Sequence, residues 1–207
     1  MSPAASSRTR PTARPAARHE LKVLRDVLAR SFWDDPIMAF LLPNERDRYT
    51  RLWSFYAMEL LTYQRLGTVL TTDDLGAAAL WAPPKRWKPT NLEVARVAHH
   101  GLRAFGPRIV DGLKILEIFD KVHPKEPHWY LGIVGADPGR QGTGAGGAVI
   151  DAVLETCDAE GIPAFLESSK ERNISYYERF GFEVTGEERL PKGGPPFWTM
   201  WREPRPR

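Results

Sequence analysis

The chain has 207 residues, 42% of them hydrophobic and 11% aromatic, enough apolar material for one globular domain with a substantial core. Its single cysteine, Cys157, excludes an intramolecular disulfide framework, and we expect it to pack in the core. The five histidines form no metal-binding motif, so no metal site is expected. No run is long and apolar enough to span a bilayer, so we expect a cytoplasmic protein without a membrane partner.

The formal net charge of +3 is concentrated at the beginning of the chain. Residues 1–18 carry four arginines and no acidic residue, and they are rich in Pro, Ala and Ser. Because such a segment has few apolar groups to bury, we predict a disordered basic tail at residues 1–18 and a single folded domain at residues 19–207. The rest of the chain is close to neutral, so no specific nucleic-acid partner is expected.

Two helices are predicted in the first third of the chain. Residues 19–32 carry leucines at helical spacing, and residues 45–65 show a second apolar face. The acidic break Asp34-Asp35-Pro36 lies between them. No convincing strand precedes residue 19, so either a first strand is missing or part of the tail supplies it.

A hairpin and two further helices are predicted next. Residues 68–72 and 77–81 suit two strands joined by a tight turn. Residues 92–104 and 109–121 then show helical spacing, with Gly-Pro between them. Towards the end of the chain, further segments suit strands, and these are residues 163–167, 182–189 and 196–201.

A glycine-rich stretch in the second half of the chain carries the strongest functional signal. Residues 128–134 suit a largely buried strand, and an Asp-Pro-Gly turn ends it. Glycines then alternate with small residues over 141–147, and helical spacing starts at Ala145. Backbone N–H groups at such a helix entrance lack partners, and the helix dipole favours negative charge there. The stretch therefore predicts a site for a phosphate or pyrophosphate.

The glycines match two known patterns. Gly142, Gly144 and Gly147 have the Rossmann spacing, with Glu167 at a suitable distance after them. The context opposes this interpretation, because residues 137–141 separate the strand from the first glycine. The short remainder of the chain also cannot easily complete a doubly wound sheet.

The second pattern resembles the coenzyme A pyrophosphate loop of the GNAT acyltransferase superfamily, Q/R-x-x-G-x-G/A. Gln141, Gly144 and Gly146 carry this resemblance. Further along, residues 173–182 (NISYYERFGF) look like the GNAT element N-x-x-x-x-Y-E-x-x-G-F. Before this element, Ser168 and Glu171 have the spacing of a capping box that would open a helix over 172–180.

The resemblance implies a mixed α/β (α+β) GNAT fold, with a central sheet split at the cofactor strand, helices on its faces, and an extra two-helix insertion around 90–121. It implies acetyl-CoA as cosubstrate and Tyr177 as the group that protonates the departing thiolate. The implied cofactor contacts are Val134, Gly135, Ala136, Gln141, Gly142, Thr143, Gly144, Ala145, Gly146 and Asn173.

The similarity reaches further over residues 124–182, which resemble puromycin N-acetyltransferase and its relatives. Thr143 stands where a lysine or arginine is common, and Arg140 could restore that charge. In GNAT folds the link between the first two helices often borders the acceptor site. Trp33, Asp34, Asp35 and Phe40 are therefore candidates for substrate contact. The alternatives, which have at least equal weight, are ordinary packing for Trp33 and Phe40 and a helix-end turn for the two aspartates.

The resemblance implies transfer of an acetyl group to an amine, which needs a base for an acceptor that is an ammonium ion at neutral pH. Glu126, His128 and Glu167 are candidates, and we select Glu126 because its PKEP run looks shared with the puromycin group. The favoured acceptor is a small-molecule amine. The alternatives are a protein lysine or N-terminal acetyltransferase and an acetyl-CoA-binding regulatory module without turnover. Homodimers are common in the superfamily, and no residue of the sequence decides the matter.

Overall fold

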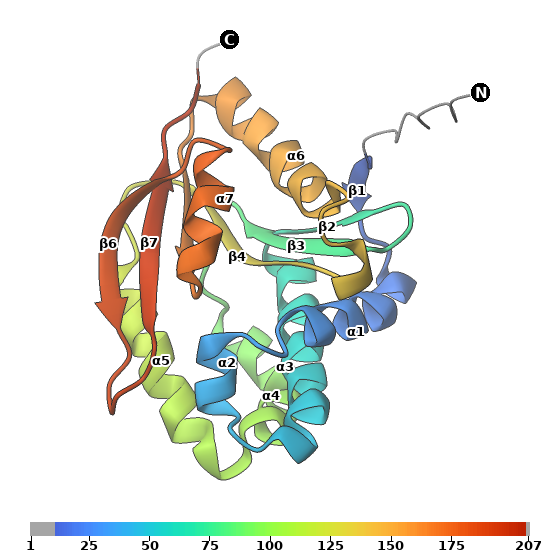
Figure 1. Cartoon of the computed structure of the whole chain (residues 1–207), viewed down its shortest axis with the longest axis vertical. Helices are drawn as coiled ribbons and strands as arrows, with labels where there is room; N and C mark the ends of the chain where they lie inside the picture. Colours follow the sequence, from blue (N-terminus) through green and yellow to red (C-terminus); the bar gives the residue numbers. More distant parts are fainter. Residues whose placement is uncertain (1–10, 206–207) are drawn as a thin grey trace, which may run out of the picture.

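The structure is a computed structural model, and it describes residues 11–205. These residues form one mixed seven-stranded sheet with the strand order β1-β2-β3-β4-β5-β7-β6 (Figure 1). All neighbouring strands are antiparallel except β4 and β5. The strands are β1 (Ala13–Pro15), β2 (Thr68–Thr72), β3 (Ala77–Ala82), β4 (Trp129–Ala136), β5 (Ala164–Ser168), β6 (Glu183–Arg189) and β7 (Pro196–Arg202).

Helices cover both faces of the sheet, so the sheet lies between two apolar cores. One core joins the sheet to α1, α2, α3, α4 and α5, and the other joins it to α6 and α7 (Figure 1). The α-helices are α1 (Leu21–Ser31), α2 (Pro36–Leu41), α3 (Glu45–Leu66), α4 (Asn91–Phe105), α5 (Ile109–Val122), α6 (Ala145–Glu160) and α7 (Ile174–Glu178). The mixed α/β fold predicted from the sequence is confirmed, and α4 and α5 form the predicted two-helix insertion.

A β-bulge interrupts the pairing of β3 with β4. Leu80 faces Ile133, whereas Trp81 faces Leu131, so Gly132 is an extra residue on β4. A Cβ at Gly132 would lie only 2.0 Å from the Tyr63 hydroxyl oxygen, so only glycine fits there. The bulge lets α3 place a tyrosine directly against the backbone of β4.

The two parallel strands in the middle of the sheet separate just beyond this bulge. β4 and β5 pair only from Trp129 opposite Ala164 to Leu131 opposite Leu166. The last five residues of β4 therefore have β3 on one side and no strand on the other. The sheet is split at β4, where the sequence predicts a split at the cofactor strand.

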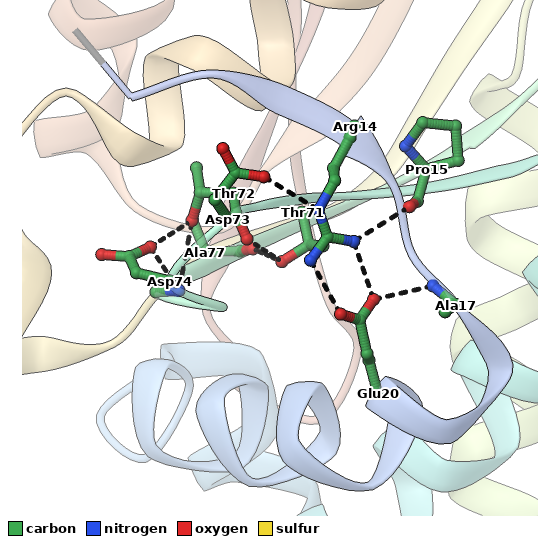
Figure 2. Close-up of polar contacts among 10 residues, drawn as sticks. Arg14, Pro15, Ala17, Glu20, Thr71, Thr72, Asp73, Asp74 and Ala77 are labelled. Atoms are coloured by element: carbon green, nitrogen blue, oxygen red, sulfur yellow. Dashed lines mark hydrogen bonds and ion pairs between the residues drawn. The ribbon is translucent and has the colours of Figure 1, made fainter. Parts of the chain in front are cut away.

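Strand β1 corrects the prediction for the tail. Its residues, Ala13–Pro15, pair with β2, so the tail supplies the first strand and the prediction of disorder is wrong for this segment. Arg14 holds β1 in place by donating to Glu20 at 2.7 and 2.9 Å and to Asp73 at 2.9 Å (Figure 2). The prediction for residues 1–10 lies outside the described residues.

The predicted capping box before α7 is wrong. Ser168 ends β5, and its hydroxyl donates to the Lys170 carbonyl oxygen at 3.0 Å and does not cap the helix. A 3₁₀ turn, Glu171–Asn173, follows before α7, which is shorter than predicted. The serine is committed to the sheet because β7 continues to pair with β5 as far as this residue.

Candidate active site

A cleft of about 750 Å³ follows the split between β4 and β5. Its walls come from the end of α1, the second half of β4, the loop before α6, the end of β5 and the segment that contains α7. Within residues 11–205, no group of three or more His, Cys, Asp and Glu side chains is arranged to hold a metal ion. No helix in the same range is long and apolar enough to cross a membrane.

The free edge of β4 presents backbone groups to the cleft. The Asp137 N–H donates to the Gly76 carbonyl oxygen at 2.9 Å, so these two residues form a hydrogen-bonded antiparallel pair. Because such pairs alternate along a strand, the N–H and C=O groups of Val134 and Ala136 point away from β3 and towards the cleft. Gly135 lies between them, where a Cβ would come within 2.6 Å of the Ser31 hydroxyl oxygen of α1.

The glycine loop adopts backbone conformations that only glycine accepts easily. Gly142 has φ +76° and Gly144 has φ +89°, and Gly144 is the N-cap of α6. The first intrahelical bond runs from the Ala148 N–H to the Gly144 carbonyl, at 3.0 Å. The N–H groups of residues 145–147 therefore have no acceptor inside the helix, and no described side chain caps it. The loop and the start of α6 form an anion-binding end of the cleft.

Several basic side chains line the cleft. Arg140 lines the cleft and pairs with Asp74 at 3.1 Å. Thr143 points its hydroxyl back to the Arg140 carbonyl, at 2.7 Å. Lys170 and Arg172 also line the cleft, and the carboxylate of Asp34 binds both.

Tyr177 and Asn173 line the same cleft from the opposite wall. Tyr177 packs in the core beneath α6 and α7, and burial is the main cause that raises the pKa of its hydroxyl above the ordinary value. The sequence grouped these two residues with the glycine loop through motifs alone. The structure brings all three together in one cleft.

The structure separates the three candidate bases. Glu126 is exposed and lies outside the cleft lining among residues 11–205, so its selection as the base has no geometric support. His128 is buried and also outside the lining. Glu167 lines the cleft, its side chain is 7% exposed, and its Oε1 atom has no hydrogen-bond partner among the described residues. Glu167 is therefore the candidate base that the geometry favours.

Sequence reasoning missed the surroundings of Glu167. Burial raises the pKa of the Tyr130 hydroxyl, and the neighbouring Glu167 and Tyr63 raise it further. Glu59 lies one helical turn before Tyr63 on α3, and burial raises its pKa to about 7. The available signal was an acidic residue on the apolar face of a predicted helix.

Asp35 is a second carboxyl group in the cleft wall. It is 2% exposed, caps α2 by accepting from the N–H groups of Ile37 and Met38, and receives a hydrogen bond from the Ser169 hydroxyl. The predicted helix-end turn and the predicted place beside the cleft are thus both present at this one residue.

Comparisons with known proteins agree with this arrangement. Residues 108–182 match the family model described as the acetyltransferase (GNAT) family. An uncharacterized N-acetyltransferase of Schizosaccharomyces pombe is 27% identical over 167 residues, which cover 75% of this chain and 67% of that protein.

Two solved structures share the fold. The first is a histone acetyltransferase HPA2 and related acetyltransferase from Corynebacterium glutamicum, with a TM-score of 0.70, 23% identity, and coverage of 95% of this chain and 98% of that one. The second is a mosquito arylalkylamine N-acetyltransferase like 5b, with a TM-score of 0.57, 15% identity, and coverage of 93% and 99%. The family match, the relative and the fold together support a GNAT acetyltransferase, which is an acyltransferase enzyme. Use of acetyl-CoA is a general property of GNAT acetyltransferases.

Proposed function

We propose that this enzyme transfers the acetyl group of acetyl-CoA to a primary amine of a small molecule. The observation that carries the proposal is one continuous cleft, with unpaired helix N–H groups at one end and Glu167 and Tyr177 deeper along it. The pyrophosphate would bind the backbone of residues 141–146, with Arg140 adding positive charge. Asn173 would contact the same cosubstrate from the opposite wall.

The free edge of β4 fits the extended arm of coenzyme A. The backbone of Val134 and Ala136 would pair with its amide groups, as a neighbouring strand would. The missing side chain of Gly135 makes room for α1 on one face of this strand. When bound, acetyl-CoA supplies a thioester carbonyl as the electrophile. An N–H of this edge aimed at the developing negative oxygen would contribute about 3 kcal/mol of transition-state stabilisation.

Two side chains would move protons. Glu167 would take a proton from the acceptor ammonium ion, because a neutral amine is needed for attack. Tyr177 would give its proton to the departing thiolate. Its raised pKa keeps the hydroxyl protonated across the whole neutral range, so the donor is always loaded. Positioning the two reactants would supply a large share of the rate enhancement.

The contacts of the turn between β6 and β7 favour a small acceptor over a protein chain. The turn between β6 and β7 is tied to α5, because Lys192 binds Asp111 at 3.0 Å. The same turn packs on α2, where a Cβ at Gly194 would come within 3.2 Å of the Phe40 ring. By resemblance to GNAT folds, the link that contains α2 borders the acceptor. A turn packed on this link leaves less room for the open groove that a protein acetyltransferase would need.

The test is release of free thiol from acetyl-CoA in the presence of a panel of amines. The panel holds puromycin, aminoglycosides, amino acids and lysine peptides, and puromycin is included because residues 124–182 resemble its acetyltransferase. We expect turnover on a small amine, with kcat at least tenfold lower in Tyr177→Phe. Tyr49→Phe, on the exposed side of α3, is the matched control and keeps full activity.

Two other results would contradict the proposal. Turnover on lysine peptides alone would assign a protein acetyltransferase. Tight binding of acetyl-CoA without turnover on any amine would favour the regulatory module. Turnover separates these two cases. In a protein acetyltransferase Tyr177→Phe should lower kcat on the lysine peptide, whereas a regulatory module has no turnover for the substitution to change.

A further inference from the structure

Two buried histidines lie behind Glu167, outside the cleft. His123 follows the last residue of α5, and His128 precedes the first residue of β4. They are 8% and 4% exposed, and their Nε2 atoms are 3.0 Å apart. The acetyl-transfer scheme above does not use either of them.

The hydrogen bonds determine which nitrogen of each ring carries a hydrogen. His128 Nδ1 lies 2.6 Å from the backbone carbonyl oxygen of Glu126, and a carbonyl only accepts, so Nδ1 is the donor. Neutral His128 then accepts at Nε2, and His123 must donate to it from Nε2. His123 is left with an unprotonated Nδ1, which faces Glu167 Oε1 at 3.9 Å.

Aromatic rings on several sides hold this pair of imidazoles in place. Trp87 stacks on His123 with ring centroids 3.6 Å apart, and Tyr130 meets the same ring edge-on. Phe165 packs against both histidines. Since rings packed in this way cannot rotate freely, the order Glu167, His123, His128, Glu126 carbonyl is a fixed part of the structure. The chain of groups runs from the cleft to an exposed loop residue.

We propose that His123 and His128 form a proton relay that accepts the proton which Glu167 removes from the acceptor amine; this inference rests on the proposed function. An N–H bond of the ammonium ion breaks, and its proton goes to Glu167. Glu167 then protonates His123 Nδ1, while the Nε2 proton of His123 moves to His128 Nε2. His128 becomes an imidazolium ion with one N–H on the Glu126 carbonyl and the other on His123.

The net result of these steps is the transfer of one proton from the acceptor amine to His128, and no electron is transferred. After the products leave and water enters the cleft, the proton returns along the same atoms to solvent. Because a charge-assisted hydrogen bond is about 2.7–2.9 Å long, Glu167 must move about 1 Å towards His123 for transfer. The Oε1 atom has no hydrogen-bond partner among the described residues, while the Glu167 side chain also interacts with the Tyr130 hydroxyl.

The surroundings suit a relay whose acceptor, His128, is neutral before the reaction. Burial lowers the pKa of His128, so the ring is neutral at physiological pH and ready to accept a proton. Glu167 faces Tyr63 of α3 and Tyr130 of β4, and Tyr63 and Tyr130 in turn face Glu59 of α3. On the other side, His128 faces His123 and the exposed Glu126.

The first test needs neither acceptor nor activity. Long-range ¹H–¹⁵N correlation spectra of the free protein at neutral pH report which imidazole nitrogen of each histidine is protonated. We expect the Nε2–H form for His123 and the Nδ1–H form for His128. The Nδ1–H form of a neutral His123 would overturn the relay, because that ring could not receive a proton from Glu167. This result is independent of whether any amine is acetylated.

The second test compares His123→Gln and His128→Asn with His99→Gln, a change at an exposed histidine of α4. We expect kcat with the amine to fall about 10- to 100-fold at pH 7 in the first two variants. The loss should shrink above pH 9, where the amine itself supplies the neutral form, and the KM for acetyl-CoA should stay within about twofold. His99→Gln should match the wild type.

The pH profile distinguishes a relay from a structural pair. Thermal melting first identifies which variants are folded, and a folded variant of either histidine is sufficient for the test. An equal loss at every pH, or no loss at all, would overturn the relay. Absence of turnover by the wild type on any amine would contradict the proposed function instead, and the tautomer measurement would still decide the relay.

Discussion

At the scale of single residues, Asp35 shows how one group can serve both the fold and the cleft. Its side chain accepts from two N–H groups at the start of α2 at 3.0 and 3.1 Å, and it lies in the cleft wall. Burial raises its pKa above the ordinary value, and the Ser169 hydrogen bond opposes this effect only in part. The buried carboxylate therefore caps well but carries a desolvated charge.

We predict opposite outcomes for two substitutions of Asp35. Asp35→Ala removes the cap and should lower the free energy of unfolding by about 1–3 kcal/mol. Asp35→Asn keeps an accepting oxygen and removes the charge, so its stability at pH 7.5 should equal or exceed that of the wild type. Urea unfolding at pH 7.5 and pH 4.5 measures both.

The pH dependence follows from the direction of the pKa shift. A carboxyl group whose pKa is raised in the folded state gives stability at low pH, and this stability is lost as the pH rises through the folded pKa. The free energy of unfolding of the wild type should therefore rise relative to that of Asp35→Asn as the pH falls from 7.5 to 4.5. If Asp35→Asn were instead more stable relative to the wild type at pH 4.5 than at pH 7.5, this result would contradict the assignment of a raised pKa.

The site residues divide according to how local their signal is. Tyr177 and Asn173 could be predicted because their motif lies within one short segment. The sequence names Glu167 only as one of three candidate bases and does not place His123 behind it, because α5, β4 and β5 bring these groups together only through tertiary packing. Glu126 is close to the cofactor strand in sequence, yet its side chain is exposed outside the cleft lining.

At the scale of elements, the two ends of α6 provide a matched pair of glycines. Gly144 at the N-cap has φ +89°, and Gly161 at the C-cap has φ +66°. An added Cβ would meet no atom closer than 3.7 Å at the first and none within 4 Å at the second. Substitution by alanine therefore strains the backbone at both ends and creates no clash.

We predict that Gly144→Ala and Gly161→Ala each lower the free energy of unfolding by about 1–2 kcal/mol, the cost of a left-handed conformation for an L-residue. Only Gly144→Ala should weaken binding of acetyl-CoA, by about tenfold, because strain there displaces the N–H groups that face the anion. Calorimetric titration measures the affinities. Equal affinities in the two variants would exclude the start of α6 as the pyrophosphate site.

Strand β1 gives a prediction about the edge of the sheet. The hydrogen bond from Arg14 is the main cause that lowers the pKa of Glu20 to about 2. In Arg14→Ala we expect faster hydrogen exchange at the Ala16 amide, which bonds the Val69 carbonyl at 2.8 Å, while amides of β3 keep their protection. Exchange monitored by mass spectrometry tests this, and unchanged protection at residue 16 would show that backbone pairing alone holds β1.

Most elements could be predicted from the sequence because their periodicity is strong over many residues, as in α3 and α6. Strand β1 could not, since its three residues, ARP, have no strand-like pattern and depend on pairing with β2 and on the contacts of Arg14. The predicted start of α7 was wrong because it also depends on strand pairing. Ser168 has the sequence pattern of a helix cap, but its pairing with β7 keeps it in the sheet.

At the scale of the whole molecule, the sheet consists of two parts joined at a short parallel ladder. Only residues 129–131 of β4 pair with β5, and the residues that follow on β4 line the cleft together with the end of β5. A ligand that pairs with the free edge of β4 and contacts the α7 segment would bridge the two parts. Its binding energy would thus add directly to the cooperative stability of the fold.

We predict that acetyl-CoA at 100 times its Kd stabilises the protein by about 2.7 kcal/mol. For a chain of this size, this corresponds to a rise in Tm of about 5–11 °C. Tyr177→Phe should show the full rise, since the hydroxyl acts only on the departing thiolate, whereas Gly144→Ala should show a smaller one at the same concentration.

NAD should give no comparable rise, because the split strand accepts an extended amide arm that a dinucleotide lacks. A rise with NAD and none with acetyl-CoA in differential scanning fluorimetry would return the glycine loop to the Rossmann interpretation.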